Sequence, residues 1–310
     1  MATVFVTRDL PGGGLSRLRA EHDVEVWPER LAPGPAVLRE RVAGAEGLLC
    51  LLTDTVDAGL IAAAPRLRAI SNLAVGCDNV DVAAARARGI PVGHTPDVLT
   101  ETTADLTLAL ILAVARRLPE GQAAVRAGEW LTWEPAWLLG RDVHGATLGL
   151  VGRGRIGEAV ARRAEGFGMT VVHTARRSGV ALADLLERAD FVSLHCPLTP
   201  ETRGLIDAEA LARMKPTAFL VNTARGPIVD QPALARALHQ GAIAGAALDV
   251  TEPEPLAPDD ALLAAPNLLV LPHVGSATHA TRARMADLAV DNLLAGLAGR
   301  TLPYEFAGPG

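Results

Sequence analysis

Three side chains that can hold an anion or move a proton each follow a short apolar run of the sequence. Arg225, Glu254 and His273 come after residues 218–222, 246–250 and 268–271, which are predicted to be buried strands. Because the carboxyl ends of parallel strands share one edge of a sheet, we expect the three side chains to converge there. A guanidinium can hold a carboxylate, an imidazolium can donate a proton, and a carboxylate can orient the imidazole ring.

Each of these residues also has a purely structural interpretation. Arg225 could pair with Asp230, Glu254 could be a solvated loop carboxylate, and His273 could be a hydrogen-bonded histidine at the edge of the sheet. Their joint placement at strand ends favours a functional site.

A glycine-rich segment lies between another predicted strand, residues 147–151, and a predicted helix, residues 158–165. Its sequence is Gly152-Arg153-Gly154-Arg155-Ile156-Gly157. In such a turn the first glycine permits a tight bend, the second lets the backbone approach a pyrophosphate, and the third lets helix and strand pack closely. The helix N-terminus adds free N–H groups. The segment predicts a dinucleotide site, which together with Arg225, Glu254 and His273 suits hydride transfer to a 2-oxo acid.

The end of the next predicted strand bears on the choice of coenzyme. An acidic residue about 20 positions after the glycines usually binds the ribose hydroxyls of NAD. Here the strand ends in Ala175-Arg176-Arg177, with no carboxylate. Guanidinium groups match phosphate oxygens, so Arg176 and Arg177 favour NADP(H), with NAD(H) as the alternative coenzyme. The two arginines could also form a solvated turn in an arginine-rich chain.

The elements that must position these residues form two series of alternating strands and helices, one before Pro96 and one from residue 147. This pattern is typical of parallel sheets covered on both faces. We predict an α/β protein with two doubly wound parallel-sheet domains, a flavodoxin-like substrate domain and a Rossmann coenzyme domain, and a cleft between them. The substrate domain is assigned residues 1–98 and 287–310, because the last helical run, residues 280–297, is placed against it. The dinucleotide-binding domain is assigned residues 99–286.

An unusual segment follows the long helix predicted over residues 101–117. Residues 121–142 are predicted to be irregular and contain Trp130, Trp133 and Trp137. Exposed tryptophans in an irregular arm usually mark an interface. We expect a homodimer in which this arm crosses to the partner, with Trp133 or Trp137 reaching the partner's substrate cleft. The alternative is that these side chains cover a core within the arm.

Composition excludes several other classes of protein. The 310 residues carry 29 basic and 35 acidic side chains, a net charge of −6, which argues against a nucleic-acid surface. Three cysteines are too few for a disulfide framework or a zinc site, so no metal is expected. The sequence shows no secretory signal and no apolar run of the ~20 residues that span a bilayer. We therefore expect a cytoplasmic protein without a membrane partner.

Several motifs resemble those of the D-isomer-specific 2-hydroxyacid dehydrogenase family, and most closely those of its glyoxylate reductase/hydroxypyruvate reductase branch. The resemblance extends from residue 47 to about residue 302. The motifs are GLLCLL (47–52), NLAVGCDNVD (72–81), TPDVLTETTAD (95–105), VGRGRIG (151–157), LVNTARGPIVD (220–230), LDVTEPEPL (248–256) and LPHVGSAT (271–278).

The resemblance implies a role for each matching residue. Arg225 would bind the substrate, Glu254 would orient His273, and His273 would donate a proton. The substrate carboxylate would contact Leu52 and the amides of Val75 and Gly76. The residues lining the coenzyme would be Thr103, Cys196, Pro197, Thr223, Ala224, Asp249 and Gly275.

The resemblance also implies reduction of glyoxylate and hydroxypyruvate, or of another 2-oxo acid, to the corresponding D-2-hydroxy acid, by a homodimer built on the coenzyme domains. Two positions depart from the family pattern. Arg153 stands where a hydrophobic residue is common, and Cys77 where many members carry an aromatic or aliphatic residue. The same fold also serves as a dinucleotide-sensing transcriptional corepressor, a function that the intact set of Arg225, Glu254 and His273 disfavours.

Overall fold

A computed structural model describes residues 1–176 and 178–308 of the chain. The chain divides into two compact units, Met1–Leu99 with Ala277–Gly310 and Thr100–Ser276. The second boundary lies before residue 277 rather than at the predicted residue 287, because helix α11 (His279–Leu297) belongs as a whole to the first unit.

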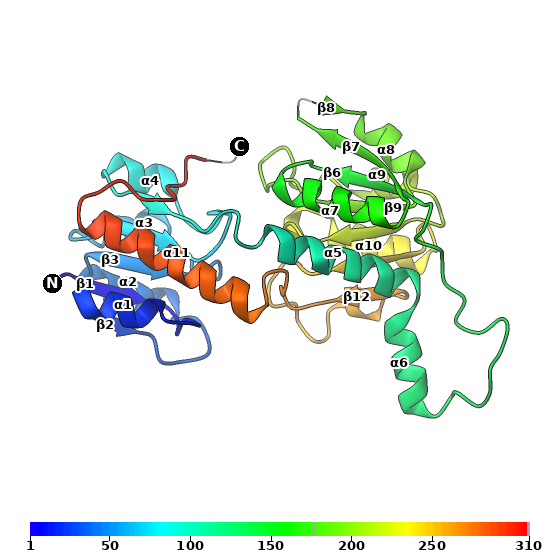
Figure 1. The fold of residues 1–310 in the computed structure, drawn as a ribbon, viewed down its shortest axis with the longest axis horizontal. Helices are drawn as coiled ribbons and strands as arrows, with labels where there is room; N and C mark the ends of the chain where they lie inside the picture. The colour runs from blue at the N-terminus through cyan, green and yellow to red at the C-terminus, as the bar shows by residue number, and fades with distance from the viewer. Residues whose placement is uncertain (177, 309–310) are drawn as a thin grey trace. The chain divides into compact units, whose positions relative to one another are not determined.

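The first unit contains a five-stranded parallel sheet with the order β2-β1-β3-β4-β5 (Figure 1). Its strands are β1 (Thr3–Val6), β2 (Asp23–Val26), β3 (Gly47–Cys50), β4 (Ala69–Asn72) and β5 (Val92–Gly93). This is the predicted flavodoxin-like order, with a topological switch point between β1 and β3. In such sheets ligands bind outside the carboxyl ends of the strands.

Helices cover both faces of the first sheet. One face packs against α1 (Gly14–Glu21) and α11, which contribute Leu18, Val290 and Leu293 to the core. The last helix therefore packs on the first sheet, as the sequence predicts. The other face packs against α2 (Pro35–Ala43), α3 (Ala58–Ala62) and α4 (Val82–Ala87).

The second unit contains a seven-stranded sheet with the order β12-β11-β10-β9-β6-β7-β8. Its strands are β6 (Thr147–Val151), β7 (Thr170–Ala175), β8 (Ser178–Gly179), β9 (Phe191–Leu194), β10 (Phe219–Asn222), β11 (Gly245–Leu248) and β12 (Leu268–Val270). All pairings are parallel except that of β8 with β7. The order is that of a Rossmann sheet, with its switch point between β6 and β9.

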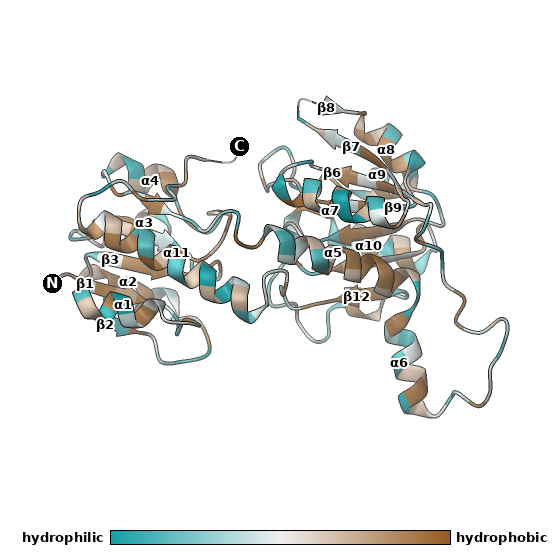
Figure 2. Cartoon of the chain, in the orientation of Figure 1, coloured by the Kyte–Doolittle hydropathy of each residue, from teal (hydrophilic) through white to brown (hydrophobic). Residues whose placement is uncertain are grey.

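The second sheet is also covered on both faces. Helices α5 (Thr100–Ala115) and α7 (Arg155–Gly166) pack on one face, and α8 (Leu182–Arg188), α9 (Ala208–Arg213) and α10 (Gln231–His239) on the other. Figure 2 shows that the strands of the second sheet are largely hydrophobic and that the helices on it, such as α7, also carry hydrophilic residues. Among the described residues, no helix is both long and apolar enough to cross a membrane.

Three local features differ from the sequence prediction. Helix α6 (Leu118–Ala127) occupies the start of the segment predicted to be irregular; it has a proline in its first turn and ends at Gly128, which is left-handed with φ 74°. Helix α7 begins at Arg155 rather than at residue 158, so the last glycine of the turn lies in its first helical turn. Strand β8 was not predicted, because a serine and a glycine that pair antiparallel at an edge carry no periodic signal.

Candidate active site

His273 and Glu254 form a hydrogen-bonded pair in the second unit. His273 Nδ1 lies 2.8 Å from Glu254 Oε2, and each side chain is 28% exposed. The other carboxylate oxygen, Oε1, accepts the N–H of Thr251 at 3.0 Å. The structure thus brings together two of the predicted site residues, and both oxygens of Glu254 have a donor.

The electrostatics of this pair decide which ring nitrogen is free. Burial alone would raise the pKa of the Glu254 carboxyl, but His273, the Thr251 N–H and the charge of Arg225 outweigh it and hold that pKa below the ordinary glutamate value. The ionised carboxylate can only accept hydrogen bonds, so His273 Nδ1 is the donor. Nε2 is therefore the ring nitrogen left for a substrate.

Asp249 fixes the backbone on which His273 stands. Asp249 comes directly after β11, and its main-chain oxygen accepts the N–H of His273 at 2.9 Å. Its side-chain oxygens accept the N–H groups of Val274 and Gly275, both at 2.7 Å. Burial raises the pKa of Asp249 despite these two bonds. Three successive N–H groups are thus held while His273 keeps a left-handed φ of 55°.

Helix α5 fastens the turns that follow β10 and β12. Thr103 donates to the carbonyl of Gly275 at 3.3 Å, and Thr107 lies 3.1 Å from the hydroxyl of Thr223. Thr103, Thr223 and Gly275 were predicted to line the coenzyme, and the structure gathers them at one edge of the second sheet. Thr107 was not predicted, because a threonine inside an apolar helix gives no signal before its tertiary neighbour is known.

Arg225 follows β10, and its main chain is held by Asn222. The Asn222 side chain donates to the carbonyl of Arg225 at 2.8 Å and accepts the N–H of Ala224 at 3.0 Å. The guanidinium donates to the carbonyl of Ala224 at 2.8 Å. Its charge also helps to lower the pKa of Glu254. Asp230, the alternative partner suggested by the sequence, caps helix α10 through the N–H of Ala233 at 2.9 Å.

The loop that carries Glu254 is clamped by Gln231, a residue that was not predicted. The Gln231 amide accepts the N–H of Glu252 and donates to its carbonyl, both at 2.6 Å. Gly226 packs so tightly against this loop that a Cβ atom there would lie 2.0 Å from the carbonyl oxygen of Thr251. The turns carrying Arg225 and Glu254 are therefore locked to each other.

The glycine-rich turn has the geometry that a dinucleotide needs. Gly152 has φ 95°, and a Cβ on it would lie 2.7 Å from the backbone nitrogen of Cys196. A Cβ on Gly157 would lie 2.4 Å from the Gly152 carbonyl oxygen, whereas one on Gly154 would meet no atom within 4 Å. The first and third glycines thus serve close packing, and the second faces open space beside the first N–H groups of α7. These residues fit a pyrophosphate.

The arginines near this turn differ in their surroundings. Arg153 pairs with Glu158 at 2.7 Å and lies 3.3 Å from His173 Nδ1, so a nearby carboxylate offsets its charge. Arg176 is exposed and follows Ala175, the last residue of β7. A hydrogen bond with Thr199 and, to a smaller extent, the charge of Arg176 lower the pKa of Glu201. Arg177 lies outside the described residues.

The segment after β9 lies against the glycine turn. It contains His195 and two predicted coenzyme residues, Cys196 and Pro197. Burial raises the pKa of the Cys196 thiol to about 11, so the thiol stays protonated near neutral pH. Burial also lowers the pKa of His195 to about 4. Its Nε2 lies 2.9 Å from the hydroxyl of Ser193, a neutral partner.

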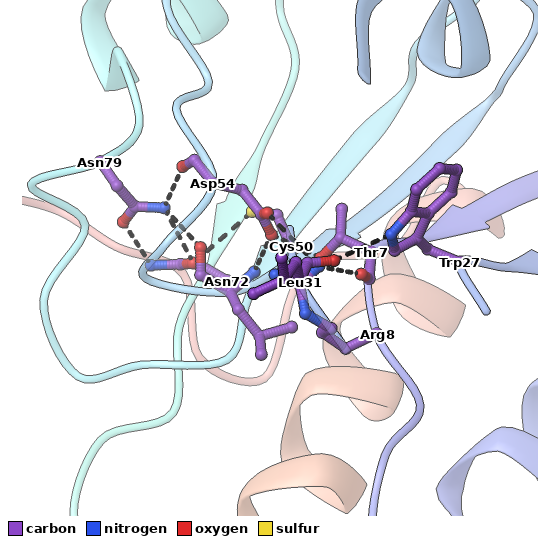
Figure 3. A network of polar contacts seen from close by, with 9 residues as sticks. Thr7, Arg8, Trp27, Leu31, Cys50, Asp54, Asn72 and Asn79 are labelled. Carbon is purple, nitrogen blue, oxygen red and sulfur yellow. Dashed lines mark hydrogen bonds and ion pairs between the residues drawn. The ribbon is translucent and has the colours of Figure 1, made fainter. Parts of the chain in front are cut away.

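The predicted substrate residues of the first unit follow β3 and β4. Leu52 is 38% exposed, and Val75 and Gly76 are half-buried. A hydrogen-bonded network of the buried Asp54 and Asn72 with the half-buried Asn79 holds the two loops that carry them, as Figure 3 shows. All three residues lie at the carboxyl edge of the first sheet.

The arm after α6 exposes apolar side chains to solvent. Trp130 is 63% exposed, Leu131 86% and Trp133 80%, whereas Trp137 is half-buried. Such exposure argues against the alternative that Trp130 and Trp133 cover a core within the arm.

The second unit matches the NAD binding domain of the D-isomer specific 2-hydroxyacid dehydrogenases over residues 108–275. The chain is 50% identical over 312 residues to a glyoxylate reductase of Korarchaeum cryptofilum, covering 97% of this chain and 94% of that protein. The chain belongs to this dehydrogenase family.

Solved structures of related proteins agree with this membership. A protein of Thermus thermophilus superposes with a TM-score of 0.94 at 53% identity, covering 98% of this dehydrogenase and all (100%) of that chain. An NADPH-dependent glyoxylate/hydroxypyruvate reductase of Sinorhizobium meliloti, in complex with NADP and malonate, superposes with a TM-score of 0.88 at 36% identity, covering 99% and 97%. The two-sheet fold of the dehydrogenase is thus shared with known members.

The low pKa of His195 predicts a pH-dependent stability. The unfolded chain takes up a proton at an ordinary histidine pKa of about 6.5, but the folded chain does so only near 4. The free energy of unfolding should therefore decrease as the pH is lowered from about 6.5 and level off below pH 4. The expected loss is about 3 kcal/mol, at 1.36 kcal/mol per pH unit. His195→Gln, which cannot titrate, should lack this component in urea unfolding measured across the range.

The control for this prediction is His144→Gln. His144 has an 80% exposed side chain, so its variant should follow the wild-type curve. Parallel pH curves for the wild type and His195→Gln would contradict a neutral His195 in the folded chain.

Proposed function

We propose that this dehydrogenase reduces glyoxylate and hydroxypyruvate to the corresponding 2-hydroxy acids, with NADPH as the preferred coenzyme. The observation that carries the proposal is the His273–Glu254 pair at 2.8 Å, whose free ring nitrogen can serve a substrate oxygen. The 50% identity to a named glyoxylate reductase supports the substrate class. A protein that only senses a dinucleotide would need no oriented proton donor.

In this proposal each residue has one task. The reduced nicotinamide supplies the hydride when it is bound. His273, as imidazolium, gives the Nε2 proton to the oxygen that becomes the hydroxyl, while Glu254 keeps the ring oriented through Nδ1. Arg225 holds the substrate and polarises its carbonyl. Leu52 and the amides of Val75 and Gly76 contact the substrate carboxylate.

The proposed coenzyme contacts rest on the glycine turn and its neighbours. The open space at Gly154 supports placing the pyrophosphate there. Arg176 and Arg177 are assigned to the 2′-phosphate, because no carboxylate ends β7 to accept the ribose hydroxyls of NAD. The remaining contacts with the coenzyme are assigned to seven residues near the glycine turn and the strand ends: Thr103, Cys196, Pro197, Thr223, Ala224, Asp249 and Gly275.

Loss of the proton donor should slow the reaction strongly. We expect His273→Ala to lower kcat by about 10²–10⁴-fold in a steady-state assay of glyoxylate reduction, with coenzyme binding unchanged. Glu254→Gln should also lower kcat, because one amide oxygen cannot accept from both Thr251 and His273. His144→Ala, at an 80% exposed side chain, is the control. Near wild-type turnover by His273→Ala would refute the assigned role.

Coenzyme preference should follow the two arginines. A single charge-assisted hydrogen bond of about 1.5–3 kcal/mol gives at least a tenfold preference for NADPH, at about 1.4 kcal/mol per factor of ten. Replacing Arg176 and Arg177 together by Ala should raise KM for NADPH and leave KM for NADH nearly unchanged. The double variant of Arg19 and Arg30, exposed arginines of the first unit, is the control. Equal kcat/KM for both coenzymes in the wild type would refute the preference.

We also propose that the chain is a homodimer whose arm, residues 121–142, contacts the partner, with Trp133 or Trp137 reaching the partner's substrate. The exposed Leu131 and Trp133 support an interface there, because water contact with such large apolar surfaces is unfavourable.

Light scattering at micromolar concentration should give the mass of a dimer. Leu131→Ser with Trp133→Ser should shift the mass towards the monomer, since it removes apolar surface from the interface. Leu31→Ser, at a 75% exposed leucine of the first unit, should leave the dimer intact. A monodisperse wild-type monomer would rule the dimer out.

A further inference from the structure

The turn at Val75 and Gly76 has its carbonyl groups occupied by partners within the first unit. The Ala74 carbonyl accepts the N–H of Thr95 at 2.8 Å. The Val75 carbonyl lies 2.8 Å from His94 Nδ1, and the Gly76 carbonyl accepts Asn72 Nδ2 at 2.9 Å. Because a carbonyl oxygen only accepts, Nδ1 of His94 carries the proton of that bond.

The N–H groups of the same turn have no such partners. Within the described part of the chain, neither the Val75 N–H nor the Gly76 N–H meets an acceptor. A trans peptide is planar, so its carbonyl and N–H point in opposite directions. The Thr95 bond to the Ala74 carbonyl therefore sets the direction of the Val75 N–H. In the same way, the His94 bond to the Val75 carbonyl sets the direction of the Gly76 N–H.

We propose that His94 and Asn72 are positioning residues that fix this turn as a two-amide receptor for a substrate carboxylate. The inference rests on the proposed function and deepens it. Successive backbone N–H groups held to one side form a concave anion site. His94 orients the Gly76 N–H through the Val75 carbonyl. Asn72 holds the Gly76 carbonyl, so that the peptide after Gly76 cannot rotate.

His94 is well fixed for this role. Its N–H donates to the Tyr304 carbonyl at 3.0 Å, and its own carbonyl accepts the side-chain amide of the fully buried Asn292 at 2.9 Å. The imidazole ring meets the ring of Phe306 edge-on, with centroids 5.2 Å apart. The C-terminal segment and α11 thus hold the histidine that holds the turn.

Asn72 couples this turn to the loop that carries Leu52. Its side chain is fully buried and exchanges hydrogen bonds with the amide of Asn79, at 3.0 and 3.3 Å. Asn79 in turn donates to the carbonyls of Leu51 and Asp54, both at 2.9 Å (Figure 3). Asp54 closes the loop by accepting the Leu51 N–H at 2.8 Å. One amide pair therefore sets both proposed substrate loops.

The test compares two replacements of His94 in the full-length enzyme. His94→Leu removes the donor, whereas His94→Asn retains an N–H at the position of Nδ1. We expect His94→Leu to raise KM for glyoxylate about tenfold, while kcat and the KM for NADPH change less than about twofold. His94→Asn should restore most of the affinity. Asn72→Asp should also raise KM for glyoxylate, because a carboxylate oxygen would then face the Gly76 carbonyl.

Two outcomes would overturn the inference. The first is an unchanged KM for glyoxylate in His94→Leu. The second is a joint fall of kcat, coenzyme affinity and thermal stability that His94→Asn does not restore, which would show a structural role alone.

Failure of the proposed function gives a different result. If the wild type reduces neither glyoxylate nor hydroxypyruvate, calorimetric binding of oxamate still tests the receptor. Tighter binding to the wild type and His94→Asn than to His94→Leu would support the receptor without the assigned reaction. Equal binding to all three would overturn the receptor as well.

Discussion

The candidate site in the second unit depends on the Glu254 carboxylate, both of whose oxygens accept a hydrogen bond. Glu254 accepts from His273 through one oxygen and from the Thr251 N–H through the other. The first bond leaves one known nitrogen of the ring for a substrate, and the second ties the carboxylate to its own loop. Gln231, Gly226 and Asp249 then hold the loops on which these groups stand. The same two bonds hold the pKa of Glu254 below its ordinary value against burial, and the charge of Arg225 makes a smaller contribution in the same direction.

Both units have the same kind of hydrogen bond at the carboxyl edge of a parallel sheet. A polar side chain in or directly after a buried strand turns back to hydrogen-bond the main chain of the neighbouring turn. Asp249 and Asn222 do this in the second unit, and Asn72 does it in the first. Since each of these side chains is almost fully buried, its bonds compete little with water. Rigid turns result where flexible loops would otherwise stand.

The sequence predicts the parts of this architecture that depend on local patterns. Buried parallel strands are continuous apolar runs, so both sheets, the glycine turn and the residues after the strand ends could be found. The roles of Gln231 and His94 could not be found, because their partners Glu252 and Val75 lie 21 and 19 residues away. Helix α6 carries its signals in the sequence, a proline in its first turn and a glycine at its end, but residues 121–142 were predicted to be irregular because their tryptophans follow no helical or strand period.

The return of α11 to the first sheet makes the second unit an insertion within the first. The second unit is one continuous stretch of chain, so all of its strands are available once residue 276 has been synthesised. The first unit must wait for Val290 and Leu293, which cover one face of its sheet. During synthesis from the N-terminus, the half of the protein that begins first is therefore the half that can close its core last.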